Sequence, residues 1–135
     1  MTNEELIKKA ASVIKSVKIN NFTTGDVGCA LETDGGNIYT GVCIDTMSSM
    51  GFCAEHNAIG TMVTNQEYKI KKIVAVWKDP KDENKIFVIP PCGRCRQFIK
   101  ETNEENLNTE IILDKNKSEK LEGLLPYHDW WQEQK

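Results

Sequence analysis

The chain has 135 residues, of which 39% are hydrophobic; this suffices for the core of one domain and nothing requires a second, so we expect a single domain over residues 1–135. Its net charge of −3 at pH 7 gives no general attraction for polynucleotide backbones, which disfavours a nucleic acid as partner and favours a small molecule. The polar N-terminus, the lack of a long apolar run and the odd number of five cysteines indicate a soluble protein of a reducing compartment, the cytoplasm, with no membrane partner.

The first half of the chain predicts one helix and one β-hairpin. Apolar residues recur at helical spacing among lysines and glutamates over residues 3–17, which is the pattern of an amphipathic helix. After a turn-rich loop at 20–25, two strand-like segments, 26–32 and 37–42, flank a Gly-Gly turn and indicate a hairpin. Residues 43–52 form an irregular loop that leads into the next helix, and such loops usually line the pocket of the site they serve.

The second half alternates helices with strands. We expect one helix from 53 to about 65 and another from 92 to about 102. The buried side of the first is predicted to carry Ala54, Ala58, Ile59, Met62 and Val63. Continuous apolar runs at 73–77 and 86–89 are typical of strands covered on both faces, and a last strand is expected at 111–113. The order α-β-β-α-β-β-α-β predicts an α/β fold with three α/β/α layers around a five-stranded mixed sheet.

Two short motifs at the starts of these helices carry the chemistry. Cys-Ala-Glu opens the first helix at 53–55, and Pro-Cys-Gly-Arg-Cys opens the second at 91–95. Thiols at a helix N-terminus ionise easily because they face unbonded amide N–H groups and the positive end of the helix dipole. The thiolates of Cys53, Cys92 and Cys95 suit Zn²⁺ and leave the fourth position of a tetrahedral site open, as catalytic zinc requires.

Glu55 is the carboxylate that such a zinc centre leaves free. It lies in the first turn of the helix that Cys53 opens, within reach of a water at the metal. Because zinc lowers the pKa of water toward neutrality, Glu55 is predicted to be the catalytic proton shuttle. Three thiolates also over-compensate the charge of the ion, and the sequence places His56, Arg94 and Arg96 where they can draw charge from the sulfurs.

A closed, structural zinc site is the alternative interpretation of the same residues. Cys43, His56 or His128 would then supply the fourth ligand, and the chain would be a zinc-stabilised binding module without activity. That interpretation assigns no function to Glu55. Cys29 and Cys43 are otherwise expected to be small buried residues.

Together the motifs, Cys-Ala-Glu at 53–55 and Pro-Cys-Gly-x-Cys-Arg-Gln at 91–97, resemble those of the small cytidine deaminase family, including its blasticidin-S deaminase branch. The likeness runs from about Val27 to Pro126 and covers most of the chain. It implies a cytidine deaminase-like fold, a Zn²⁺ cofactor and hydrolytic deamination of a small nucleoside, as in pyrimidine salvage. Glu55 would hand a proton to N3 of the base and then to the leaving amine. The family also implies a homotetramer in which a neighbour completes each pocket.

The resemblance implies five substrate contacts, which are Cys43, Asp45, Ala54, Arg94 and Trp131. The family's ribose-binding Asn-x-Glu corresponds to residues 43–45, which keep a carboxylate at Asp45 but lose the amide at Cys43. The backbone around Ala54 would hold the base. Arg94 matches an arginine of the blasticidin-S branch, and Trp131 aligns with a tail tryptophan of that branch.

The aromatic residues that stack on the base elsewhere in the family are missing from their usual places. Those places hold Gly25 and Asp129 here. Trp130 or Trp131 would supply the missing ring, and the alternative is that the aromatic tail fills a subunit interface.

The resemblance is compatible with three functions. Deamination of cytidine or deoxycytidine is favoured, because Asp45 preserves the acidic group of the ribose site. The second is deamination of a modified cytosine nucleoside such as blasticidin S, and the third is the zinc-stabilised binding module. A polynucleotide deaminase is disfavoured, because those relatives carry His-x-Glu in the first motif and need a basic surface.

Overall fold

The computed structural model describes residues 1–135. Its helices are α1 (Asn3–Ser12), α2 (Ala54–Thr64), α3 (Gly93–Thr102) and α4 (Leu121–Leu124), with two short 3-10 segments, η1 (Met47–Ser49) and η2 (Glu104–Asn108). Its strands are β1 (Val17–Ile19), β2 (Phe22–Thr24), β3 (Val27–Thr33), β4 (Ile38–Val42), β5 (Ile70–Asp79), β6 (Asp82–Ile89), β7 (Glu110–Asp114) and β8 (Lys117–Lys120). No helix has the length and apolar character needed to cross a membrane.

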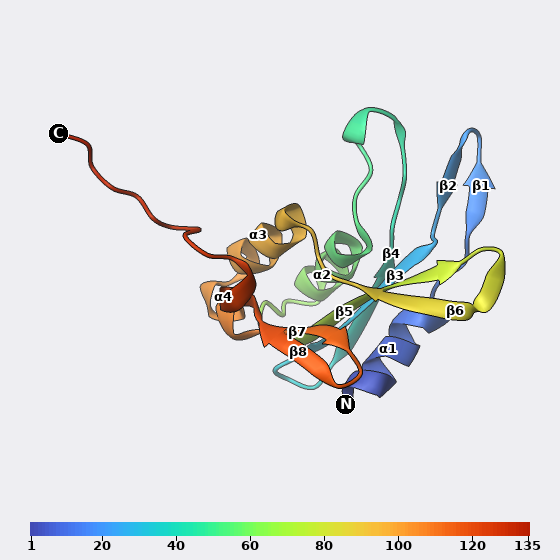
Figure 1. Cartoon of the computed structure of the whole chain (residues 1–135), viewed down its shortest axis with the longest axis horizontal. Helices are drawn as coiled ribbons and strands as arrows, with labels where there is room; N and C mark the ends of the chain where they lie inside the picture. The colour runs from blue at the N-terminus through green and yellow to red at the C-terminus, as the bar shows by residue number, and fades with distance from the viewer.

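Six strands form one mixed sheet in the order β4-β3-β5-β7-β8, with β6 paired to β5 beside this path (Figure 1). β3 is antiparallel to β4 and to β5, whereas β5 and β7 are parallel. The strand β5 divides its second edge between two partners. Lys72 and Ile73 pair with β7, and the segment from Ala75 to Asp79 pairs with β6. The chain therefore leaves β6 and begins α3 close to the point where β6 and β7 diverge.

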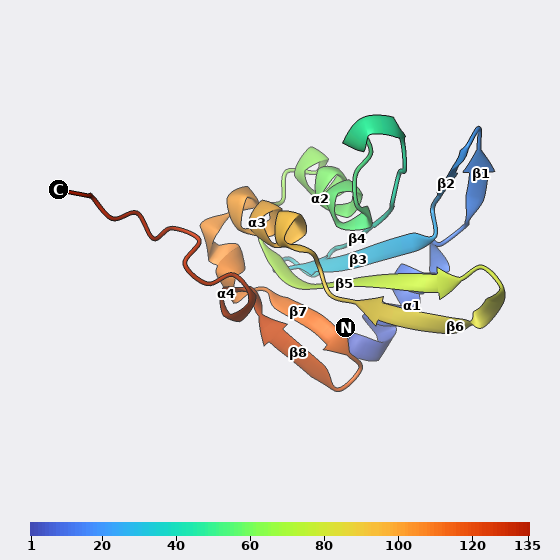
Figure 2. The ribbon, with the colours of Figure 1, turned by 45° about the horizontal axis from the view of Figure 1, so that its top comes forward.

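Helices cover both faces of this sheet, which confirms the predicted three layers. Figure 2 shows α2 and α3 on one face and α1 on the other. The α1 side buries the cluster Leu6, Ile7, Ala10, Ala30, Val74, Val76 and Ile112. The α2 and α3 side buries a larger cluster that includes Cys29, Leu31, Ala58, Ile59, Met62, Ile73, Ile99 and Ile111. Neighbouring residues of β3, β5 and β7 thus alternate between two cores, as strands buried on both faces must.

The helix α2 approaches the sheet closely because β4 has a glycine beneath it. A Cβ atom at Gly41 would lie 2.5 Å from the backbone nitrogen of Ala58 and 2.9 Å from the backbone oxygen of Ala54. The Asn57 side chain also donates to the backbone oxygen of Val42 at 3.1 Å. These contacts fix the N-terminus of α2, and with it the first of the two motifs.

The first helix is shorter than predicted. It ends at Ser12, and residues 17–19 form β1, which pairs with β2 across the two-residue turn Asn20-Asn21. The backbone of Lys15 meets Gly25, where a Cβ atom would lie 2.4 Å from the Lys15 oxygen. The apolar spacing continues through Val17 and predicts more helix than forms, because this tertiary contact and the β-branched residues of β1 favour a hairpin.

Two other expectations about strands were wrong. The charged segment after β7, which was predicted to be a link, contains the exposed edge strand β8, so the sheet has six strands instead of five. The residues of β8 are polar and show no alternation of apolar and polar residues, so the sequence pattern did not reveal this strand. The strand β6 is not covered on both faces, since Ile86 is 42% exposed and Phe87 is 49% exposed. The strand β6 pairs only with the C-terminal half of β5, residues 75–79, which extends past α2 and α3 (Figure 2). The prediction that Val63 lies on the buried side of its helix was also wrong, because Val63 is 38% exposed on α2.

Candidate active site

The two sequence motifs converge at the N-termini of α2 and α3. Cys53 is the N-cap residue of α2 and Cys92 is the N-cap residue of α3, and neither side chain forms the usual capping hydrogen bond. Both thiols therefore remain free to bind another group at the positive end of a helix dipole. Cys95 lies in the first turn of α3 and is buried.

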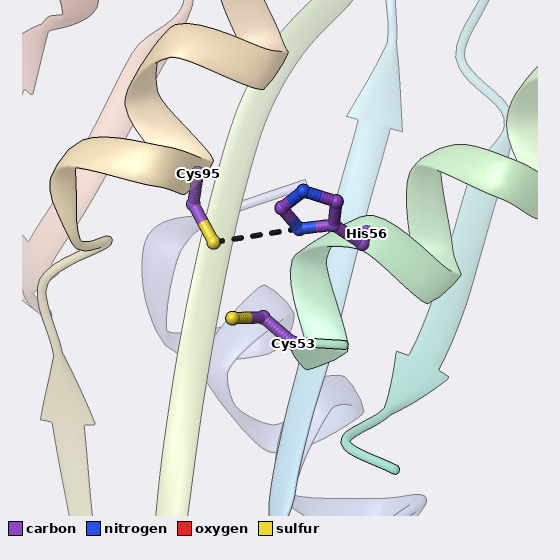
Figure 3. A group of neighbouring side chains, drawn as sticks. All are labelled: Cys53, His56 and Cys95. Carbon is purple, nitrogen blue, oxygen red and sulfur yellow. Dashed lines mark hydrogen bonds between the residues drawn. The ribbon is translucent and has the colours of Figure 1, made fainter. Parts of the chain in front are cut away.

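A compact group of ligand atoms joins the two helices. Figure 3 shows Cys53 and His56 from α2 and Cys95 from α3, with their ligand atoms all within 4.8 Å of one another. The Cys95 sulfur lies 3.6 Å from Nδ1 of His56. Cys92 is exposed and stands outside this group, although its thiol interacts with the Cys95 side chain.

The surroundings of the thiols differ in their effect on ionisation. The backbone N–H groups of Cys95 and then Arg94, at the start of α3, lower the pKa of the Cys92 thiol. Burial instead raises the pKa of Cys53 and, far more strongly, that of Cys95. A metal ion needs thiolates, so its binding must displace the protons that the protein alone favours at these two sites. Sulfur donors with one imidazole beside them are a set that fits Zn²⁺.

His56 is held in place by an aromatic neighbour that the sequence did not reveal. Its ring stacks on that of Phe98, with centroids 4.1 Å apart and planes inclined by 8°. The pKa of His56 is lowered mainly by burial and, to a smaller extent, by the positive charge of the nearby Arg94 guanidinium. Of the three alternative fourth ligands named above, His56 alone is beside the thiols, because Cys43 belongs to another group and His128 lies in the tail.

Glu55 is buried, with 6% of its surface exposed, in the first turn of α2. Burial raises the pKa of its carboxyl group, and hydrogen bonds with its own backbone N–H and with the Cys95 thiol oppose this shift. A carboxyl group whose pKa moves toward neutrality can both take and return a proton under working conditions.

One pocket of about 450 Å³ brings most of the predicted site residues together. Its walls include Cys53, Ala54, Glu55, Cys92, Arg94 and Cys95, and they also include Cys43 and Asp45. Trp131 is not among them. It is 89% exposed on a tail that extends away from the body of this chain, as Figure 1 shows.

The pocket also contains residues that the sequence analysis missed, above all Asp26. Cys43 donates its S–H to Oδ1 of Asp26 at 3.2 Å, and its sulfur lies 3.8 Å from Oδ2 of Asp45. Nε1–H of Trp77 donates to the other oxygen of Asp26 at 3.4 Å. The one available signal was the position of Asp26, which directly follows Gly25 at a site where the family contacts its base.

The thiol cluster, the buried glutamate and the fold agree with one family. Residues 1–110 match the family model described as the cytidine and deoxycytidylate deaminase zinc-binding region. The chain belongs to this family. Membership confirms the expected Zn²⁺ cofactor and the class of enzyme, a hydrolase that acts on the C–N bond of a cyclic amidine.

Individual relatives of this deaminase point to two branches of the family. A blasticidin-S deaminase from Bacillus cereus is 36% identical over 98 residues, which are 70% of this chain and 69% of that protein. A probable cytidine deaminase from Dictyostelium discoideum is 41% identical over 73 residues, which are 53% of this chain and 46% of that protein. The chain thus spans less than half of the second relative.

Solved structures confirm the cytidine deaminase-like fold. The cytidine deaminase of Mycobacterium leprae superposes with a TM-score of 0.73 at 25% identity, over 93% of this chain and 99% of the other. That of Burkholderia pseudomallei gives a TM-score of 0.72 at 24% identity, over 93% and 98% of the two chains.

Proposed function

We propose that this deaminase hydrolyses the 4-amino group of a cytosine nucleoside, converting cytidine or deoxycytidine to the uracil nucleoside and ammonia. The observation that carries the proposal is the buried Glu55 carboxylate in the same pocket as three thiols from two helix N-termini. Five free cysteines support a reducing compartment, and we infer a cytoplasmic role in pyrimidine salvage.

The zinc ligands that we propose are Cys53, Cys92 and Cys95, with His56 as a hydrogen-bond partner of the Cys95 sulfur. The 3.6 Å contact between His56 and Cys95 and the lowered pKa of Cys92 support this division of roles. With His56 as a fourth ligand the site would be closed, and Glu55 would have no water to act on. When bound, zinc supplies the Lewis acid that makes water nucleophilic near neutral pH.

Glu55 is proposed to move the protons of the reaction. Its carboxylate accepts a proton from the attacking water and donates it to N3 of the pyrimidine. It then takes the second proton, from the hydroxyl group now on C4, and donates it to the amine, so that the C4–N bond breaks, ammonia leaves and the C4 carbonyl forms. The backbone at Ala54 orients the base, and the N–H groups at the start of α2 face the charge that develops on it. Cys43, Asp45 and Arg94 contact the remainder of the substrate.

A modified cytosine nucleoside such as blasticidin S is the second candidate substrate. Two observations favour it: the identity to the Bacillus cereus blasticidin-S deaminase, and the presence of Arg94 in the pocket wall. Both candidates require the same chemistry at C4 and differ in the group attached to the base.

Ammonia release from cytosine, cytidine, deoxycytidine, blasticidin S and adenosine tests the proposal. We expect turnover of cytidine or deoxycytidine and none of adenosine. Glu55→Gln should keep zinc and fold while turnover falls by roughly 10² or more, the scale of lost acid-base catalysis. Glu104→Gln, which alters an exposed carboxylate of η2, is the matched control and should retain full activity. Near-normal turnover in the Glu55 variant would exclude the proton shuttle, and no release from any cytosine nucleoside would favour the binding module.

A further inference from the structure

The aromatic ring of Phe98 lies beside the proposed zinc ligands, although no step of the proposed reaction uses it. Phe98 follows Cys95 by three residues on α3, so both side chains project from neighbouring positions on one side of that helix. That side faces His56 on α2. The Cys95 sulfur lies 3.6 Å from Nδ1 of His56, and the Phe98 ring stacks on the imidazole with centroids 4.1 Å apart and planes inclined by 8°. One polar and one aromatic contact from α3 therefore hold the imidazole.

The imidazole of His56 has space beside it in two directions. On its outer side it borders a hollow of about 420 Å³ along α2, whose walls include Gly60 and Thr64. On its inner side, a nitrogen of the ring lies within 4.8 Å of the sulfurs of Cys53 and Cys95, as Figure 3 shows. The stack on Phe98 fixes the plane of the ring between these two directions, because a flat contact is lost when either ring tilts.

The inner position suits two different roles of the imidazole. A sulfur and a nitrogen that bind one tetrahedral Zn²⁺ lie roughly 3.5 Å apart, because their bonds to the ion are about 2.3 and 2.0 Å long. The 3.6 Å between Cys95 and His56 is close to this separation, and it also allows Nδ1–H to donate to a Cys95 thiolate. As a donor, His56 leaves the fourth position of the zinc open for water, whereas as a ligand it closes that position.

We propose that Phe98 is a positioning residue that holds His56 as a hydrogen-bond partner of Cys95 and so keeps the imidazole off the metal. The inference rests on the proposed function, which requires an open fourth position, and it adds the residue that keeps this position open. A leucine at position 98 offers an apolar side chain but no flat ring, so the imidazole gains the freedom to turn onto the ion. Loss of an aromatic pair shifts such an equilibrium by roughly 2- to 10-fold.

The rate of zinc release from the holoenzyme to a chromophoric chelator tests this role. Phe98→Leu should release zinc roughly 2- to 10-fold more slowly than the wild type, because a fourth protein ligand then holds the ion, and its kcat should fall by a similar factor. A substitution that merely loosened α3 would have the opposite effect on release. Phe98→Tyr keeps the flat ring and should restore both rates. Tyr68→Leu removes an exposed aromatic side chain elsewhere and is the matched control, which should change neither rate.

The cobalt-substituted enzyme shows directly whether His56 binds the metal. Exchange of water for imidazole changes the visible ligand-field bands of Co²⁺, so the spectrum of Phe98→Leu should differ from that of the wild type. Arginine does not bind the ion, because its guanidinium group has no acceptor atom. Addition of His56→Arg to Phe98→Leu should therefore return the spectrum and the rate of metal release to those of His56→Arg alone.

Faster or unchanged zinc release in Phe98→Leu, or a cobalt spectrum identical to that of the wild type, would overturn the proposal. Loss of zinc from His56→Arg alone would also overturn it, since His56 would then be a ligand in the wild-type enzyme. Both metal measurements are made without a nucleoside, which separates these outcomes from a failure of the proposed function. If no cytosine nucleoside is deaminated while release and spectra change as expected, the function is wrong and the role of Phe98 stands.

Discussion

Asp45 carries its carboxylate on a shorter side chain than the glutamate that the family uses to hold ribose. Its backbone N–H donates to the Thr24 hydroxyl at 3.2 Å, which fixes the position of the loop. If the pocket holds the ribose of cytidine, Asp45→Ala should raise KM for cytidine by roughly tenfold or more, because a hydrogen bond to a charged group is lost.

Cys43→Asn is the companion variant, because it restores the amide that the family places beside its carboxylate. Steady-state kinetics with cytidine and blasticidin S should show tighter binding of cytidine in Cys43→Asn. A wild-type enzyme that is poor with cytidine and indifferent to Asp45→Ala would contradict ribose binding by these residues.

Tyr39 and Glu67 provide a pH-dependent contact away from the pocket. The Tyr39 hydroxyl donates to Glu67 at 2.6 Å, and this bond is the main reason that the pKa of Glu67 is lowered. A lowered carboxyl pKa contributes stability above the pKa of the unfolded chain, about 4.3, and loses it as the pH falls through the folded value. Tyr39→Phe should therefore lower Tm by a few degrees at neutral pH, with a difference that narrows in acid. Thermal melts at several pH values check this, and a constant difference would contradict it.

The residues of the site divide into those that local spacing could predict and those that it could not. Cys53, Glu55, Cys92 and Cys95 lie at helix starts, where the motif itself sets the geometry. The contact between Asp26 and Cys43 depends on the register of two strands, in which Gly28 pairs with Val42. The predicted hairpin paired these two strands, but the sequence did not fix the register that brings Asp26 beside Cys43, so Asp26 was missed.

At the scale of elements, a zinc ion held by the proposed ligands would link α2 to α3. Because the proposed ligands come from both helices, loss of one should loosen both. Cys92→Ser should sharply reduce bound zinc, measured by metal analysis, and lower Tm. Ser118, exposed on β8, offers a control in Ser118→Cys, since a thiol added there should change neither quantity. If Cys92→Ser kept full zinc occupancy and an unchanged Tm, Cys92 would not be a zinc ligand.

Elements with a strong apolar pattern were predicted well, and polar ones were not. The helices α2 and α3 and the strands β3, β5 and β7 bury apolar residues, so the apolar pattern of the sequence reflects their structure. The strands β1 and β8 are exposed, and β2, which lies in the segment 20–25 that was predicted to be a loop, pairs only with β1. These three strands form mainly through backbone pairing. Backbone pairing carries no side-chain signature, which is why all three were missed.

At the scale of the whole molecule, this chain leaves large aromatic side chains uncovered. Trp130 is 67% exposed and Trp131 is 89% exposed in the tail, and Phe87 is exposed on β6. We infer that these surfaces meet other subunits in a homotetramer, in which a neighbour's Trp131 completes each pocket.

Sedimentation velocity tests this assembly. It should show a single species of about four chain masses, and replacing both tail tryptophans by alanine should weaken assembly and activity together. A monomer that persists at all concentrations with full activity would contradict the tetramer.

The divided edge of β5 also separates the two halves of the site along the chain. Cys53 precedes β5 in the chain, whereas Cys92 and Cys95 follow β6, which pairs with β5 and leads into α3. Contacts between segments this distant in sequence are slow to form. A chain that stops before residue 92 holds only one of the three proposed thiol ligands. We therefore expect zinc to enter a nearly finished fold, so that a shortage of the metal would lower the yield of active enzyme without preventing the assembly of α1 and the sheet.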